Sequence, residues 1–246
     1  MTTERRMLAV GGQDRSEFLQ GLITNDVLHL KDGLVYAALL TAQGKYLADF
    51  FLLDRGDDIL LDAPAAVWDA LVKKLKMYKL RSKVTLDEVD VSLARGLGEA
   101  PEGALRDPRH PAMGWRAYGT DLTDEDVDWD ALRVANCIPE AGVELVPDES
   151  FILECGFTRL NGVDFRKGCY VGQEVTARMH HKTELKKGLA TVSVEGEAPV
   201  GTPITSEGKP AGTLYTQAGG QGIAYLRLNR AQGAMEAGEA RLMLAA

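Results

Sequence analysis

The 246-residue sequence predicts an α+β fold followed by a small all-β unit. Two early segments, residues 14–23 and 62–75, carry apolar residues at helical spacing, and continuous apolar runs between them predict buried strands. From about Glu184 onward, short β-branched runs alternate with glycine turns, a pattern typical of small all-β units. We therefore expect two domains, residues 1–183 and residues 184–246.

The first predicted helix and hairpin follow from capping and periodicity. Asp14 and Glu17 have the spacing of a capping box and predict a helix start. Residues 33–54 hold two apolar runs separated by a Gln-Gly-Lys turn at 43–45, which predict a hairpin with buried strands. The buried stripe predicted for the helix comprises Phe18, Leu19, Leu22 and Ile23.

The middle of the sequence predicts a strand, a long helix and further strands. Residues 57–80 predict a strand and then a helix that is capped by Asp62 and has Pro64 in its first turn. Residues 82–97 predict one or two strands, the Gly- and Pro-rich stretch 98–119 a connecting loop, and 129–136 a short helix. The predicted stripe of the long helix is Val67, Leu71, Val72 and Leu75.

The composition limits the class of protein. Hydrophobic residues make up 45% and charged residues 26% of the chain, as in ordinary soluble proteins. No apolar run approaches the length of a membrane-spanning helix. The opening residues MTTERRMLAV lack the apolar core of a secretory signal, so we expect a cytoplasmic protein. A net charge of −8 argues against a general polyanion-binding surface, and we expect neither direct nucleic-acid binding nor a membrane partner.

The cysteines predict neither a disulfide framework nor a metal site. Cys137, Cys155 and Cys169 are few and unevenly spaced, and no C-x-x-C occurs. A structural zinc would need four Cys or His ligands in groupings that the sequence does not contain. We therefore expect no permanently bound metal.

The stretch FRKGCYVGQEVTARMHHKT, residues 165–183, holds the strongest candidate site. Arg166 and Lys167 precede Cys169, and residues 171–179 predict a helix that begins just after it. Cations and a helix N-terminus both stabilise a thiolate, so Cys169 is a candidate functional thiol. Because free cysteines are commonly buried and inert, a structural role in a glycine-bounded turn is an equally good interpretation.

Polar and basic residues follow the cysteine. Gln173 and Glu174 either favour the helix start or face a pocket for a heteroaromatic ligand. The basic cluster downstream is either a solvated helix end or a site for carboxylates, in which Arg178 could chelate with both its nitrogens. A nucleophilic pair of Cys169 with a histidine lacks a third group to orient it. The cluster comprises Arg178, His180, His181, Lys182, Lys186 and Lys187.

Three further residues are candidates for holding a polar ring. They are Asn25, Asp49 and Asp62, and each also has a plain interpretation as a helix end, a strand residue or a helix cap.

The sequence resembles the YgfZ family at KGCYVGQE. The signature matches in full at Lys167, Gly168, Cys169, Tyr170, Gly172, Gln173 and Glu174. FLQGLITNDV, LLTAQGKYLADF, YKLRSKV and IPEAGVELVPDESFILE resemble other segments of the same family, in the expected order, so the resemblance covers nearly the whole chain.

YgfZ proteins are similar in fold to the T-protein of the glycine cleavage system, a tetrahydrofolate-dependent aminomethyltransferase. The resemblance therefore implies a folate-binding domain of packed α+β subdomains around a central cavity, followed by a C-terminal β-barrel. It also implies a role in assembling or repairing iron–sulfur proteins, including radical enzymes that modify tRNA, and a functional motif cysteine.

The sequence departs from the transferase where that enzyme carries carboxylates. Ala48-Asp49 stands in place of its paired aspartates, Lys45 replaces a glycine before them, and Ala135 takes the position of a folate-facing glutamate. Fewer carboxylates leave fewer groups to orient folate or to transfer protons, so aminomethyl transfer is disfavoured.

The leading hypothesis is a tetrahydrofolate-binding accessory protein for iron–sulfur proteins. Cys169, at the cavity edge, would act as a redox-active thiol, a transient ligand or a contact to the client. The expected partners are folate or its polyglutamates and iron–sulfur client proteins. The alternatives are a folate-dependent one-carbon transferase or demethylase and a pure interaction module. The predicted folate contacts are Asn25, Asp49, Asp62, Gln173, Glu174 and Arg178, the last meeting the glutamate tail with nearby lysines.

Overall fold

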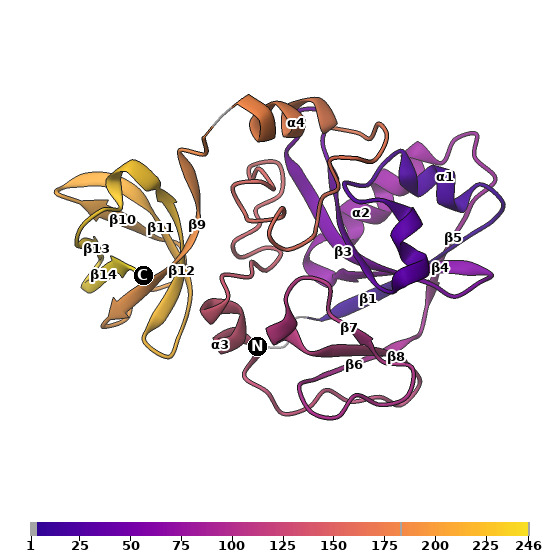
Figure 1. The fold of residues 1–246 in the computed structure, drawn as a ribbon, viewed down its shortest axis with the longest axis horizontal. Coiled ribbons are helices and arrows are strands. Elements are labelled where there is room, and N and C mark those ends of the chain that lie inside the picture. Colours follow the sequence, from indigo (N-terminus) through magenta and orange to yellow (C-terminus); the bar gives the residue numbers. More distant parts are fainter. Residues whose placement is uncertain (1–3, 183, 246) are drawn as a thin grey trace.

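A computed structural model describes residues 4–182 and 184–245 and contains three β-sheet units. Figure 1 shows a large five-stranded sheet on one side of the molecule, a C-terminal barrel on the other, and a small sheet below. The large sheet has the order β2-β3-β4-β1-β5, and its paired strands are antiparallel. Its strands are β1 (Arg5–Gly11), β2 (Val35–Leu40), β3 (Tyr46–Asp54), β4 (Asp58–Pro64) and β5 (Thr85–Val89).

The predicted hairpin and long helix are confirmed. β2 and β3 pair around the turn at 43–45, and nearly all their residues are buried because helix and loop segments cover the sheet. α2 (Ala65–Tyr78) packs on β1, β3 and β4. The four predicted stripe residues of α2 are all buried, together with Trp68.

Both predicted helix caps are wrong in detail. The Asp14 side chain precedes α1 (Arg15–Gln20) but accepts the backbone N–H of Lys83 instead of capping the helix. Asp62 lies inside β4, and α2 begins after Pro64 without a side-chain cap. In both places a long-range polar partner competes successfully for the carboxylate. The first helix also ends at Gln20, and η1 (Val27–Asp32) follows the turn after it.

The stretch predicted as a connecting loop instead forms most of a second sheet. Its strands have the order β6-β8-β7, and a short helical turn, η2 (Pro111–Met113), precedes β8. Gly114 follows this turn with a φ of 62°, a backbone conformation that residues other than glycine rarely adopt. This conformation lets the chain enter β8. The strands are β6 (Ser92–Gly96), β7 (Leu105–Arg106) and β8 (Trp115–Gly119).

The chain then passes through α3 (Trp129–Ala135), a long irregular segment and α4 (Gln173–Lys182) before it enters the barrel. The barrel is closed, with the order β10-β11-β12-β9-β14-β13, and it has its own apolar core. The α+β fold with a C-terminal barrel, as predicted, is confirmed. The barrel contains β9 (Lys187–Glu195), β10 (Thr202–Ser206), β11 (Lys209–Ala218), β12 (Gln221–Arg227), η3 (Leu228–Arg230), β13 (Met235–Ala237) and β14 (Ala240–Leu244).

Candidate functional site

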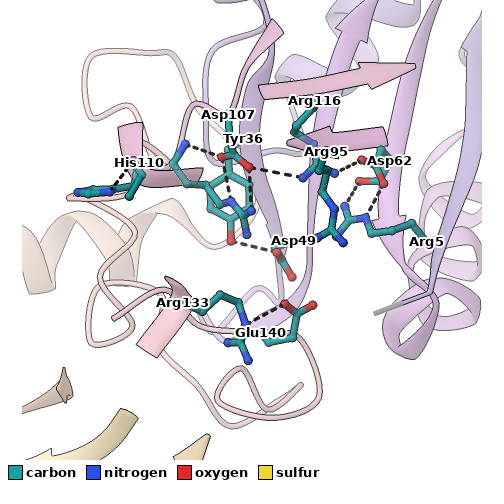
Figure 2. Close-up of polar contacts among 12 residues, drawn as sticks. Arg5, Tyr36, Asp49, Asp62, Arg95, Asp107, His110, Arg116, Arg133 and Glu140 are labelled. Carbon is teal, nitrogen blue, oxygen red and sulfur yellow. Dashed lines mark hydrogen bonds and ion pairs between the residues drawn. The ribbon is translucent and has the colours of Figure 1, made fainter. Parts of the chain in front are cut away.

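A buried ion-pair network lies where the large and small sheets meet (Figure 2). Asp62 of β4 accepts from Arg5 Nε at 2.6 Å and from Arg116 Nη2 at 2.6 Å. The Tyr118 hydroxyl donates to the same carboxylate at 2.8 Å. Burial acts to raise the pKa of Asp62, but the two guanidinium groups outweigh it and hold the pKa below its ordinary value. Asp62 is therefore an ionised structural anchor that accepts hydrogen bonds from protein side chains at both of its oxygens.

Asp107 extends the network from the segment predicted to be a loop. Its carboxylate pairs with Arg109 at 2.8 Å and with Arg116 at 3.4 Å. The Arg116 guanidinium also stacks on Phe51, 3.9 Å from the ring centroid. A guanidinium that is buried against two carboxylates and an aromatic ring stays charged and fixed in place.

Asp49 lies nearby in a different environment. It accepts from the hydroxyls of Tyr36, at 2.9 Å, and Tyr46, at 2.6 Å. Burial raises the pKa of Asp49, and the two hydroxyl donors offset only part of that effect. Figure 2 shows Asp49 between Tyr36 and the pair formed by Arg133 and Glu140.

The central cavity is small because these side chains fill it. Its volume is about 20 Å³, which is room for about one water molecule. Arginines dominate its wall, and each of them pairs with a carboxylate. The lining residues are Arg5, Arg95, Arg109, Met113, Arg116, Trp129, Asp130, Arg133 and Glu140.

The signature loop, residues 165–172, contains Cys169 and does not line this cavity. Buried residues anchor it on both sides of the cysteine. The buried Lys167 ammonium donates to the carbonyls of Gln20, Ile23 and Asn25 at 2.8, 2.6 and 2.8 Å. Tyr170 is also buried, while Gly168 and Cys169 between them are exposed. The backbone of the loop is thus anchored while the Cys169 thiol faces solvent.

A larger pocket adjoins the start of this loop. It has a volume of about 640 Å³, within the range of small-molecule sites. His29 Nε2 and the Asp164 carboxylate lie 3.1 Å apart in it, within hydrogen-bond distance. Cys169 lines neither this pocket nor the central cavity. The residues that line the pocket are Asn25, His29, Leu34, Val35, Tyr36, Pro108, Asn161, Val163, Asp164, Phe165 and Arg166.

The six predicted folate contacts lie in three separate places. Asn25 lines the 640 Å³ pocket but donates its amide to the carbonyls of Tyr36 and Asn161. Asp49 and Asp62 belong to the buried centre. Gln173 is the first residue of α4, and Glu174 and Arg178 form an exposed i, i+4 ion pair at 2.8 Å on the same helix. The structure therefore separates Gln173, Glu174 and Arg178, on the surface helix α4, from the three residues predicted to line the folate cavity.

Asp107 and Arg109, which follow β7, and Arg116 of β8 were not among the residues predicted for the site. Arg116 and Tyr118 alternate with Trp115 and Ala117, a period of two that marks a two-faced strand. The Gly- and Pro-rich composition around them concealed that signal. The partners of Arg116 lie far away in sequence, so only the fold shows that its charge is buried.

The fold is that of a glycine cleavage aminomethyltransferase. The solved structure of glycine cleavage system aminomethyltransferase T from Bartonella henselae matches 98% of this chain and 83% of its own, with a TM-score of 0.78. Sequence identity is 14%, so this likeness establishes the fold alone. The barrel, residues 186–246, matches the family model described as CAF17, C-terminal beta-barrel domain.

Curated relatives define the family more closely. The mitochondrial iron–sulfur cluster assembly factor IBA57 of Mus musculus is 32% identical, over 93% of this chain and 77% of the relative. The Homo sapiens protein of the same name is 31% identical with the same coverage. The chain belongs to the IBA57 family, which is related to the YgfZ proteins but is a more specific assignment.

The names of the matched relatives correct the expected location. The expectation of a cytoplasmic protein is wrong, because the matched relatives are named as mitochondrial. A missing secretory signal does not distinguish one non-secretory compartment from another. Within residues 4–182 and 184–245, no helix is long and apolar enough to span a membrane. The same residues contain no group of three or more His, Cys, Asp or Glu side chains that could hold a metal ion.

Proposed function

We propose that this protein is an iron–sulfur cluster assembly factor whose Cys169 thiol meets the cluster or its client protein. The names of the mouse and human relatives support the process. The exposure of Cys169, between the buried Lys167 and Tyr170, carries the assignment of the residue. An anchored backbone with a free side chain presents the thiol in a fixed position.

The other two thiols are poorly suited to this role. Burial raises the pKa of Cys155 to about 12, so its thiol stays protonated near neutral pH. Burial also raises the pKa of the partly buried Cys137. Because iron binds the thiolate, an exposed cysteine is the better ligand.

A single thiol cannot complete the coordination of a cluster. Iron–sulfur clusters are commonly held by four cysteines, and the described residues contain no group of three or more His, Cys, Asp or Glu side chains that could hold a metal ion. The proposed role is therefore a shared one, in which a partner protein provides the remaining ligands. Radical tRNA-modifying enzymes, implied by the YgfZ resemblance, are the proposed clients.

The test replaces each thiol in turn in cells that lack the native protein. Cys169→Ser is expected to abolish the recovery of iron–sulfur enzyme activity per amount of enzyme protein. Cys137→Ser, the matched control, is expected to restore it. Full recovery with Cys169→Ser, at equal protein level, would refute the role of this thiol.

Folate binding is a separate component of the proposal. The central cavity does not fit a pterin, since its volume is about 20 Å³ and Asp49 and Asp62 already accept hydrogen bonds from protein groups. The 640 Å³ pocket has sufficient volume, and we place the proposed tetrahydrofolate site there. We do not propose aminomethyl transfer, because Ala48 and Ala135 supply no carboxylates.

Calorimetry with tetrahydrofolate and its polyglutamates tests this component. Saturable binding that weakens in a His29→Ala variant supports the pocket. No heat of binding at high micromolar folate removes the folate component and leaves the proposal for Cys169 intact.

A further inference from the structure

A groove runs along the outer side of α2 beside β5, in a different part of the fold from the sites above. Its volume is about 530 Å³. Met77 supplies most of the accessible apolar surface, and Trp68 and Val72 line the groove beneath it but are themselves nearly fully buried. Lys73 and Lys76 supply positive charge. Lys73, Lys76 and Met77 are exposed, Met77 by 52%. The groove therefore combines an apolar floor with a basic rim.

The two carboxylates in the groove are already paired. Arg6 contacts Glu88 at 2.6 Å and Asp69 at 3.6 Å, and its guanidinium stacks on Trp68 at 4.7 Å from the ring centroid. Within the described part of the chain, no carboxylate lies within ion-pair distance of Lys73 or Lys76. Lys76 lies near enough to Glu88 to help lower the pKa of that carboxyl, but neither lysine is held in an ion pair among the described residues, so both ammonium groups can meet an external anion.

The basic surface continues past the end of α2. The segment 73–83 contains six basic residues and no acidic one, in a protein whose net charge is −8. Leu80 lies among them and is 88% exposed. Apolar side chains that are exposed together beside a groove commonly mark an interaction surface. The basic residues are Lys73, Lys74, Lys76, Lys79, Arg81 and Lys83.

We infer that this groove binds an acidic segment of a partner protein that carries an apolar anchor side chain. The anchor would fill the floor formed by Trp68, Val72 and Met77, and its flanking carboxylates would pair with Lys73 and Lys76. A concave apolar floor suits a side chain better than a flat lipid surface. Nucleic-acid phosphates would pair with the lysines but would bring no aliphatic side chain to the floor of the groove.

Cys169 is not among the residues that line the groove. The N-terminal end of α1 contacts the end of the basic segment, where the Asp14 carboxylate accepts the Lys83 N–H at 2.7 Å. The other end of α1 contacts the signature loop through Lys167 and the Gln20 carbonyl. The inference does not depend on the proposed role of the Cys169 thiol.

The experiment uses the full chain, labelled with ¹³C at the methionine methyl groups. The probe is a synthetic peptide of glutamates with one central leucine, compared with a peptide in which serine replaces the leucine. The leucine peptide is expected to shift the Met77 methyl signal saturably and to bind more tightly than the serine peptide. Charge reversal in a Lys73→Glu/Lys76→Glu variant is expected to weaken binding at least about tenfold.

A Lys31→Glu/Lys209→Glu variant is the matched control, because it changes two exposed lysines elsewhere and gives the same net charge. Its affinity for the peptide is expected to equal that of the native chain. Circular dichroism checks that both variants are folded. An unshifted Met77 signal, equal weakening in the two variants, or tighter binding to phosphatidylglycerol vesicles or duplex DNA at the same salt would each overturn the inference.

Discussion

The buried centre and the signature loop use charged side chains in opposite ways. In the centre, Asp62 and Arg116 are both buried, and each has several partners within the protein. In the signature loop, a single buried charge, Lys167, holds the backbone, while the neighbouring Cys169 has its side chain in solvent. In the centre, the polar side chains bind one another and hold the two sheets together. In the loop, the Cys169 thiol stays exposed to solvent.

This difference shows how a fold shared with a transferase can lose one site and present another. Carboxylates that face a cavity can orient a ligand only if they have free acceptor positions. Both oxygens of Asp49 and of Asp62 already accept hydrogen bonds from protein side chains. The loop needs no cavity, because its proposed role requires only an accessible thiol in a fixed position.

The largest expected effect comes from Asp62→Ala. Removing this carboxylate leaves Arg5 and Arg116 with reduced compensation in a buried setting, which typically costs about 3–5 kcal/mol. Urea denaturation should show this loss in the free energy of unfolding at neutral pH. A loss under about 1 kcal/mol would show that the network contributes little net stability.

The same variant has a defined pH dependence. The pKa of Asp62 is lowered by folding, so its contribution to stability is present above the unfolded value of about 3.9 and is lost as pH falls through the folded pKa. The stability difference between the native chain and Asp62→Ala should be constant from pH 7 to about 5 and shrink at lower pH. A constant difference down to pH 2 would contradict this assignment.

A smaller loss of about 2–3 kcal/mol is expected for Lys167→Ala, since three backbone carbonyls lose a charged donor. Amide hydrogen exchange should quicken in residues 165–170, while the centre stays protected. Lys31→Ala, at an exposed lysine, is the control and should change neither measurement. Unchanged exchange in the loop would show that Lys167 does not anchor it.

Gly172→Ala is expected to cost about 1–2 kcal/mol, because Gly172 has a φ of 83° and an added Cβ would lie 2.5 Å from the Thr41 carbonyl oxygen. The melting temperature should fall accordingly. Gly56→Ala, also at positive φ but with open space around it, separates backbone strain from this contact. An equal fall in both variants would mean that the contact contributes nothing.

The smallest effect is expected for Glu174→Ala, about 0.3–0.5 kcal/mol, because its ion pair with Arg178 is exposed on both sides. Raising the salt concentration should remove most of this difference. A loss above about 1.5 kcal/mol would indicate that Glu174 has a further partner in the folded protein.

The sequence predicted elements whose signal is local. The stripe of α2, from Val67 to Leu75, and the β2–β3 hairpin follow from periodicity and a glycine turn, and both are confirmed. The site required longer-range information. Asp62 meets Arg5 57 positions away and Arg116 54 positions away, and no local pattern encodes such pairs. Asp62 also lies close to the start of α2 in the sequence, a position that suits a helix cap equally well. This is why the prediction that Asp62 caps the helix failed.

The signature motif was a stronger guide than the individual polar residues. Its full match predicted a family of iron–sulfur assembly factors, and the IBA57 relatives support that relationship. Residue type and position in the sequence did not reveal whether Asp49, Asp62 and Arg178 face a cavity, a protein partner or solvent.

Gly168 and Gly172, on either side of Cys169, differ in whether the fold requires a glycine at their position. Gly172 is required by its own backbone conformation and by a close neighbour, whereas an added Cβ at Gly168 would meet nothing within 4 Å. Folding therefore gives no reason for a glycine at 168. Without a side chain at 168, a partner protein can approach the Cys169 thiol closely. A bulky residue at this position would therefore leave the fold stable but hinder that approach.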